Sequence, residues 1–319
     1  MHSCLYCYLP LYEPGQLDFH EACSQEFFGS KSAPLLGYSL DQMTELAKTI
    51  VERSISIPGV QPKISLSLVK DATAPGKNAR LTVVGALGGN YIFKPPNADF
   101  PELPENEHLT MRIAQAMGIR TAPCSLIRLV SGELSYITRR IDRTPTMEKI
   151  HMLDMFQITE ATDKYRSSLE KVGTAVQQYA SNTGLDLLRY FELTIFSFLT
   201  GNSDMHLKNF SMITTMEGEW ELSPAYDLLN VRIAMPADKE ELALTLHAKK
   251  SKFKRADFDY LGHRLDLSER QINGVYGRFS KATPVVMDWI DRSFLSEDMK
   301  QAYRTLVTER YARLKLDSA

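Results

Sequence analysis

The sequence has few cysteines, no long apolar run and almost no net charge. Four cysteines among 319 residues are too few for a disulfide-stabilised scaffold. No apolar run approaches the roughly 20 residues of a membrane-spanning helix, and the amino-terminus lacks the basic-then-apolar pattern of a secretion signal. A formal net charge of −2 supplies no electrostatic attraction to nucleic acid. These absences predict a cytoplasmic protein that binds neither a membrane nor nucleic acid directly.

Length and composition are those of a large globular protein. A chain of 319 residues can bury a sizeable core, and two domains are expected at this length. Hydrophobic residues make up 44% and charged residues 24%, which excludes neither an enzyme nor a binding protein. There is no internal repeat or low-complexity tract, so the informative features are short motifs.

The stretch from residue 200 to residue 230 carries the strongest chemical signal. An apolar run over 187–199 predicts a helix that ends at a Gly-Asn pair. Asp204 follows this pair, Asn209 comes after four intervening residues, and Asp227 comes after a predicted pair of short strands. Phosphoryl transfer needs a carboxylate near the attacking hydroxyl and oxygen ligands for Mg²⁺, and this spacing is that of a protein-kinase catalytic loop and its metal-binding aspartate. The alternative is that both aspartates merely cap turns.

A lysine stands at the end of the third of three predicted strands. Apolar and β-prone residues predict strands over Ile64–Val69, Leu81–Ala86 and Tyr91–Lys94. Lys94 would then occupy the position of the kinase lysine that neutralises nucleotide phosphates. Outside that context, a lysine at a strand end is ordinarily only solvated.

Helical patterns account for much of the remaining chain. A capping box begins a predicted amphipathic helix over Ser39–Arg53. A second helix, Glu105–Met117, is bounded by a proline and a glycine, and the helix dipole favours the carboxylates of Glu105 and Glu107 in its first turn. A hairpin is expected over Cys124–Thr138. Further helices are predicted over Asp163–Tyr179, Leu185–Thr200 and, several in number, Asp257–Leu316.

Three of the four cysteines lie near the amino-terminus together with a histidine. Cys4 and Cys7 form a C-x2-C pair, and His20 and Cys23 form an H-x2-C pair twelve residues later. Thiolates and imidazole suit tetrahedral Zn²⁺, so these residues are a candidate structural zinc site. The alternative is a set of small buried thiols beside aromatic residues. Those aromatic residues are Tyr6, Tyr8, Phe19, Phe27 and Phe28.

One basic run, Lys249–Arg255, stands before the last predicted helices. Such a run is ordinarily a solvated face. The alternative is a docking surface for a negatively charged protein or an RNA-bound substrate.

Six motifs follow one another in the order found in a known family. They are SISIPGVQPK, YIFKPP, LPENEHLTMRIA, TRRIDR, GNSDMHLKNF and SPAYDLLN. From about Ser54 to its carboxyl end, the chain resembles the HipA-like serine/threonine kinases, the toxins of bacterial toxin–antitoxin modules. The resemblance implies an α+β, bilobal, protein-kinase-like fold with a β-rich N-lobe and a mainly helical C-lobe. The implied boundaries are 1–37 for the Cys/His segment, 38–142 for the N-lobe and 143–319 for the C-lobe.

The resemblance also implies a role for each residue of the site, with ATP and Mg²⁺ as cofactors. Asp204 would orient or deprotonate the attacking hydroxyl. Asn209 and Asp227 would hold Mg²⁺, and Lys94 would bind the phosphates of ATP.

Supporting residues follow from the same resemblance. Glu107, favoured over Glu105, would pair with the lysine, and His206 would support the catalytic loop through a hydrogen bond. The loop serines, Ser54 and Ser56, would be autophosphorylated. Nucleotide contacts would come from Ser56, Gly59, Val60 and Gln61 in the loop, and from Arg139, Arg140 and Ile141 in an interlobe hinge, mainly through backbone groups.

Within the family, the chain resembles the short HipT form, because few residues precede the nucleotide loop. This implies a HipS-like small protein and a HipB-like DNA-binding antitoxin as partners. It also implies an aminoacyl-tRNA synthetase as the target, the tryptophanyl enzyme before the glutamyl enzyme. The alternatives are a pseudokinase acting as a binding or co-repressor module, and a lipid or small-molecule kinase. The presence of all four reactive residues argues against the first, and the lack of a membrane-attachment signal argues against a lipid substrate.

Overall fold

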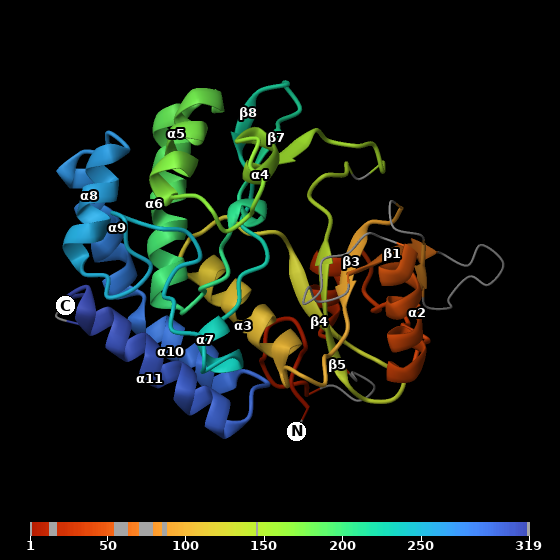
Figure 1. Ribbon diagram of the computed structural model, residues 1–319. Coiled ribbons are helices and arrows are strands. Elements are labelled where there is room, and N and C mark those ends of the chain that lie inside the picture. The colour runs from red at the N-terminus through yellow and green to blue at the C-terminus, as the bar shows by residue number, and fades with distance from the viewer. Residues whose placement is uncertain are drawn as a thin grey trace. The chain divides into compact units, whose positions relative to one another are not determined.

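The chain divides into two compact units in the computed structural model (Figure 1). Unit 1 comprises Met1–His108, Ala122–Met147 and Arg292–Phe294, and unit 2 comprises Leu109–Thr121, Glu148–Asp291 and Leu295–Ala319. The structure describes residues 2–12, 18–53, 63–69, 79–84, 88–144 and 146–317. Among the helices in these ranges, none is both long and apolar enough to cross a membrane.

Unit 1 is built on a five-stranded antiparallel sheet with the strand order β2-β1-β3-β5-β4. Strands β1 (Ile64–Val69) and β3 (Tyr91–Lys94) have the predicted bounds. Strand β2 (Arg80–Val83) begins one residue earlier than predicted and ends before the predicted bound. The predicted hairpin forms β4 (Cys124–Arg128) and β5 (Leu134–Arg139). This order places β3, which carries the candidate lysine, at the centre of the sheet.

The connection into β3 passes close to the backbone of β1. Gly89 has a φ of +90°, and a Cβ atom at this position would lie 2.4 Å from the carbonyl oxygen of Leu66. The same carbonyl accepts a hydrogen bond from the Asn90 N–H at 3.0 Å. Glycine is therefore required here for both its left-handed backbone and its missing side chain.

Helices α1 (Glu21–Phe28) and α2 (Leu40–Arg53) lie in unit 1, and α3 (Leu103–Ala116) begins there. The predicted capping box of α2 forms, because the Ser39 N–H donates to Gln42 Oε1 at 2.9 Å and the Gln42 N–H donates to Ser39 Oγ at 3.4 Å. Helix α3 begins two residues before its predicted start, with a proline in its first turn, where a missing N–H costs nothing.

Unit 2 is mainly helical and is organised around α6 (Thr183–Leu199). Every residue from Tyr190 to Leu199 is buried, so the carboxyl-terminal half of α6 is enclosed on all sides. A three-stranded antiparallel sheet in the order β6-β7-β8 belongs to the same unit. The other elements that lie in or reach unit 2 are β6 (Met152–Asp154), α4 (Met155–Ile158), α5 (Leu169–Tyr179), the 3₁₀ helix η1 (Leu207–Asn209), β7 (Ser211–Thr214), β8 (Trp220–Leu222), α7 (Val231–Ala234), α8 (Arg255–Arg264), α9 (Glu269–Lys281), α10 (Thr283–Arg292) and α11 (Glu297–Arg313).

The predicted start of α5 at Asp163 is wrong. The helix begins at Leu169, where the Ser168 hydroxyl caps it by accepting a hydrogen bond from the Lys171 N–H at 3.2 Å. Residues 163–168 form an irregular segment instead. That segment matters for the site described below, because it supplies a tyrosine to the candidate catalytic loop.

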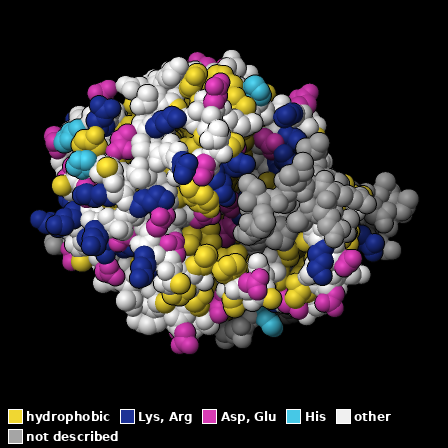
Figure 2. Space-filling model, viewed as in Figure 1, with side chains coloured by type: hydrophobic (Ala, Val, Ile, Leu, Met, Phe, Trp, Pro, Cys, Tyr) yellow, Lys and Arg dark blue, Asp and Glu magenta, His cyan; other side chains and the backbone are white. Residues whose placement is uncertain are grey.

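Two lysines of the basic run Lys249–Arg255 pair with acidic neighbours. Lys249 Nζ lies 2.6 Å from an oxygen of Asp257, and Lys250 Nζ lies 3.0 Å from one of Glu240. On the face of unit 2 that Figure 2 shows, basic and acidic side chains are interspersed. These pairs favour the solvated-face interpretation over a docking surface.

Candidate active site

The candidate catalytic loop begins with a glycine turn at the end of α6. Gly201 has a φ of +69°, and a Cβ atom there would lie 2.4 Å from Leu306 Cδ2 and 2.9 Å from Asn230 Oδ1. The Gly201 carbonyl accepts the Val231 N–H at 3.1 Å, and Asn230 Oδ1 accepts the Ile233 N–H at 3.2 Å. The turn that leads into Asp204 is therefore bonded directly to the segment that follows Asp227.

Backbone bonds fix the position of Asp204 within this loop. Its N–H donates to Asn202 Oδ1 at 3.3 Å, and its carbonyl accepts the His206 N–H at 2.8 Å. The same carbonyl accepts Asn209 Nδ2 at 3.0 Å. The amide nitrogen of Asn209 thus closes the loop, and its amide oxygen is the atom able to ligate a hard cation.

A tyrosine holds the Asp204 carboxylate. The Tyr165 hydroxyl donates to Asp204 Oδ1 at 2.8 Å, and the Tyr165 ring packs edge-on against the His206 ring at a centroid distance of 5.1 Å. Burial, followed by the negative charge of Asp204, raises the pKa of the Tyr165 hydroxyl, so it remains a proton donor to the carboxylate at neutral pH. Tyr165 was not identified from the sequence, because it lay inside the wrongly predicted start of α5.

Asp227 sits in a strained turn anchored to the catalytic loop by its neighbour. Its φ is +62°, a left-handed conformation that Asp and Asn adopt more readily than most residues. The Tyr226 hydroxyl lies 2.5 Å from Ser211 Oγ and donates to the Lys208 carbonyl at 3.0 Å. Lys208 immediately precedes Asn209, so the two segments proposed to bind metal are tied together. Carboxylate and amide oxygens are the donors that Mg²⁺ prefers, so this pair of residues fits that ion.

Unit 1 contains the lysine at the end of β3. Lys94 Nζ lies 2.7 Å and 2.8 Å from the two carboxylate oxygens of Glu107 on α3. The two residues are only 4% and 2% exposed. Across the sheet, Tyr136 is the register partner of Lys94, and its ring centroid lies 5.3 Å from Nζ. The lysine is therefore a buried, oriented cation rather than a solvated strand end.

Of the two glutamates near the start of α3, Glu107 is the one that contacts the lysine. Burial, with a smaller contribution from Glu102, raises the pKa of Glu105 to about 7. A carboxyl group compensated by a buried cation would show the opposite shift. The two glutamates thus have different environments, which their spacing alone did not distinguish.

The side chains of the predicted hinge make contacts within unit 1. Arg139 donates to the carbonyls of Glu26, at 3.0 Å, and Phe27 at the end of α1. Arg140 forms a bidentate pair with Asp142 at 2.8 Å and 2.6 Å. Ile141 is half-buried. The side chains of Arg139 and Arg140 are thus engaged within the unit, and the contact of this segment with adenine stays a prediction.

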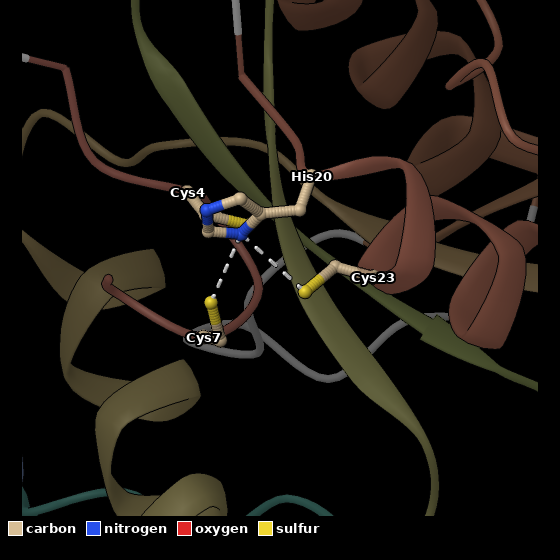
Figure 3. A group of neighbouring side chains, drawn as sticks. All are labelled: Cys4, Cys7, His20 and Cys23. Atoms are coloured by element: carbon tan, nitrogen blue, oxygen red, sulfur yellow. Dashed lines mark hydrogen bonds between the residues drawn. The ribbon is translucent and has the colours of Figure 1, made fainter. Parts of the chain in front are cut away.

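Two further predicted sites belong to the amino-terminal part of the chain. Ser54, Ser56, Gly59, Val60 and Gln61 lie outside the described residues. The amino-terminal Cys/His residues do come together, with all four ligand atoms within 4.8 Å of one another (Figure 3). They are Cys4, Cys7, His20 and Cys23.

Comparison with known proteins identifies the family. The sequence model of the HipA-like C-terminal domain matches residues 55–287, which is most of the chain. The chain belongs to the HipA-like family. The resemblance inferred from six short motifs is thereby confirmed, and the motifs from YIFKPP to SPAYDLLN lie within the matched HipA-like region.

Curated HipA-like relatives are named as kinases. A candidate kinase of Haemophilus influenzae is 30% identical over 56% of this chain and 54% of its own length. The serine/threonine-protein kinase toxin HipA of Shewanella oneidensis is 27% identical over 58% of this chain and 47% of its own length. The chain spans about half the length of the curated relatives it matches.

Two solved structures share the fold. The HipA, HipB and operator DNA complex of S. oneidensis MR-1 matches with a TM-score of 0.64 and 22% identity, over 82% of this chain and 65% of that one. The proinflammatory kinase CtkA of Helicobacter pylori matches with a TM-score of 0.50 and 15% identity, over 80% of this chain and 94% of that one. The predicted α+β, protein-kinase-like fold is therefore confirmed.

Proposed function

We propose that this HipA-like chain is an ATP- and Mg²⁺-dependent protein kinase that phosphorylates serine or threonine. The observation that carries the proposal is the fixed position of the Asp204 carboxylate. The Tyr165 hydroxyl donates a hydrogen bond to it, and the Asp204 carbonyl accepts one from the Asn209 side chain. An aspartate that serves only as a turn residue would not need its carboxylate held by a tyrosine hydroxyl from a distant segment. The names of the relatives give independent support.

The proposed reaction assigns one task to each side chain. Asp204 accepts the proton of the attacking hydroxyl while the hydroxyl oxygen bonds to the γ-phosphorus. The bond from that phosphorus to the bridging oxygen breaks, and ADP leaves with the electron pair. Lys94, oriented by Glu107, binds phosphate oxygens in unit 1. Mg²⁺ held by Asn209 and Asp227 would neutralise charge on the phosphates.

The charge of Asp227 can be tested without disturbing its backbone. Asp227→Asn keeps a residue type that tolerates the positive φ. Loss of one anionic ligand should weaken Mg²⁺-dependent ATP binding by roughly tenfold or more, which corresponds to about 1.4 kcal/mol. Titration calorimetry with ATP, with and without Mg²⁺, measures this. The variant should match the parent chain when Mg²⁺ is omitted, and unchanged affinity with Mg²⁺ would reduce Asp227 to a turn residue.

The Tyr165 hydroxyl gives a second test, one that separates positioning from nucleotide binding. Tyr165→Phe keeps the ring against His206 but removes the hydrogen bond to Asp204. We expect kcat to fall about tenfold, since a hydrogen bond to a charged group is worth roughly 1.5 kcal/mol or more, while KM for ATP stays unchanged. The control is Tyr179→Phe, an exposed tyrosine at the end of α5, which should change neither constant. A normal kcat in Tyr165→Phe would contradict the positioning role.

Autophosphorylation of Ser54 or Ser56 is part of the proposal. A phosphate on the nucleotide loop adds about −1.5 to −2 charges beside the phosphates of ATP, so it should repel the nucleotide and limit the enzyme's own activity. Intact-mass analysis followed by peptide mapping should locate the phosphate on these serines. Phosphate found only on other residues would contradict autophosphorylation at Ser54 or Ser56.

The proposed biological role is that of a toxin acting in the cytoplasm on an aminoacyl-tRNA synthetase, the tryptophanyl enzyme first and the glutamyl enzyme next. A HipB-like DNA-binding antitoxin is the proposed partner, supported by the HipB in the matching S. oneidensis complex. A HipS-like small protein, the partner of the short HipT form, is a second proposed partner. Labelling a cell lysate with γ-labelled ATP and the purified chain, followed by identification of the labelled proteins, tests the target. A labelled set without any synthetase would overturn that assignment.

A further inference from the structure

We infer that Cys4, Cys7, His20 and Cys23 bind a structural zinc ion, and that this zinc site supports the helix turn bearing Glu107. The second part rests on the proposed kinase function, whereas the first does not. In Figure 3 the four side chains converge from two segments, the turn after the amino-terminus and the start of α1.

The spacing of the ligand atoms matches a tetrahedral zinc ion. Zn–S and Zn–N bonds of about 2.3 and 2.0–2.1 Å place neighbouring ligand atoms about 3.6–3.8 Å apart in a tetrahedron. His20 Nδ1 lies 3.4 Å from Cys7 Sγ and 3.7 Å from Cys23 Sγ. No pair among the four ligand atoms is further apart than 4.8 Å. All three cysteines are free thiols, so no disulfide competes for the sulfurs.

The histidine is held in the tautomer that a metal ligand requires. His20 Nε2 lies 3.0 Å from the Pro10 carbonyl oxygen. A carbonyl only accepts hydrogen bonds, so Nε2 carries a proton, and Nδ1 is the ring nitrogen that faces the sulfurs. An outer hydrogen bond of this kind, from the second ring nitrogen to a backbone carbonyl, is typical of histidines that ligate metals.

The backbone around the cysteines is shaped to present them together. The Tyr8 N–H donates to the Cys4 carbonyl and the Cys4 N–H donates to the Leu9 carbonyl, both at 2.9 Å, so the C-x2-C pair lies in a closed turn. Tyr8 has a φ of +65°, a strained value for an aromatic residue. His20 is the N-cap of α1, which brings Cys23 three residues later onto the same side. Buried thiols that merely fill space would not need this turn.

The cluster connects to the lysine–glutamate pair through one side chain. The hydroxyl of Tyr8, the residue after Cys7, lies 2.8 Å from His108 Nδ1. The two rings pack edge-on with their centroids 5.2 Å apart. His108 directly follows Glu107, the partner of Lys94. A metal that fixes the cysteine turn thereby fixes a contact to the helix turn that orients the lysine.

Further contacts join the cluster to the sheet. The Leu5 carbonyl accepts the Leu126 N–H of β4 at 3.3 Å, and Asp18 pairs with Arg128 at 3.0 Å. A segment with one eight-residue helix is too short to form a core of its own, and a metal is a usual means of holding such a segment in place. The zinc ion would hold the amino-terminal segment against the sheet in this way.

The test begins with the metal content of the purified full chain. Elemental analysis should find about one zinc per chain, the stoichiometry of a four-ligand structural site. Cys23→Ser should lose the zinc, whereas Cys124→Ser, which changes a buried cysteine on β4 outside the cluster, should keep it. Well-folded parent chain without zinc, iron in place of zinc, or full zinc in Cys23→Ser would each overturn the site.

A second arm remains informative if Cys23→Ser fails to fold. Replacing the zinc of the parent chain by Co²⁺ should give the intense visible absorption of tetrahedral thiolate ligation, and its absence with cobalt bound would overturn the assignment. Removing zinc with a chelator should lower both the thermal unfolding midpoint and phosphoryl transfer, and added zinc should restore both.

The connection to Glu107 has its own test. Tyr8→Phe should keep zinc but lower phosphoryl transfer, and unchanged transfer would contradict the proposed support of the helix turn that bears Glu107. Zinc binding without any kinase activity would leave the site standing and remove the proposed function.

Discussion

Asp204→Asn should abolish phosphoryl transfer and leave the chain folded. The amide cannot accept the proton of the attacking hydroxyl, and loss of a positioned acid–base group typically costs ~10²–10⁴-fold in rate. Asparagine keeps the size of the side chain and an oxygen that can accept the Tyr165 hydroxyl. The bonds of the loop to the Asp204 N–H and carbonyl are untouched. Steady-state transfer and thermal unfolding, measured on the same preparation, test both halves of the expectation.

The matched control for this variant is Asp298→Asn. Asp298 is an exposed aspartate in the first turn of α11, so the same chemical change there should leave transfer unaltered. Transfer by Asp204→Asn at the rate of the parent chain would remove Asp204 from the reaction. Unfolding of the variant would contradict the other half of the expectation and would show that the carboxylate stabilises its loop.

Breaking the Lys94–Glu107 pair should produce the largest loss of stability. Removing one member of a buried ion pair leaves an uncompensated charge and typically costs about 3–5 kcal/mol of folding free energy. Lys94→Met and Glu107→Leu should each show this loss, because both side chains are almost fully enclosed. The double variant should recover most of the stability, since a buried pair replaced by apolar residues of similar size is often nearly neutral.

Catalysis should not recover with stability. The double variant lacks the Lys94 cation that would bind phosphate at the end of β3. Its rate of phosphoryl transfer should therefore remain at least about 100-fold below that of the parent chain. Urea unfolding and phosphoryl transfer measure the two properties separately. Lys31→Met is the control, because its pair with Glu21 is largely exposed and should be worth at most about 1 kcal/mol. Normal transfer by the double variant would show that the pair serves only the fold.

Much of the site could be predicted because its parts are local in sequence. The strand ending at Lys94 has apolar and β-prone residues between turn residues, and the helix before Asp204 ends at a glycine that must adopt a positive φ. The relative order of motifs then identified the family. Local patterns of this kind depend on a few neighbouring residues, so they can be recognised without knowledge of tertiary contacts.

The remaining features depend on contacts between distant segments. Residues 163–166 have ordinary helix propensity, but two contacts with the catalytic loop hold them in an irregular conformation. The Leu207 N–H donates to the Lys164 carbonyl at 3.1 Å, and the Tyr165 hydroxyl donates to Asp204. The choice of Glu107 over Glu105 is likewise set by where β3 ends. Neither contact leaves a periodic signal in the sequence.

Transfer of label from γ-labelled ATP is the most direct test of the proposed kinase activity. The full chain is incubated with labelled ATP, Mg²⁺ and a mixture of cell proteins, beside the Asp204→Asn variant at equal concentration. Hydrolysis of the labelled proteins followed by phosphoamino-acid analysis then shows where the phosphate resides. We predict phosphoserine or phosphothreonine with the parent chain and none with Asp204→Asn. No labelled protein from a chain that binds ATP and Mg²⁺, or label only in lipids or small molecules, would contradict the proposed activity.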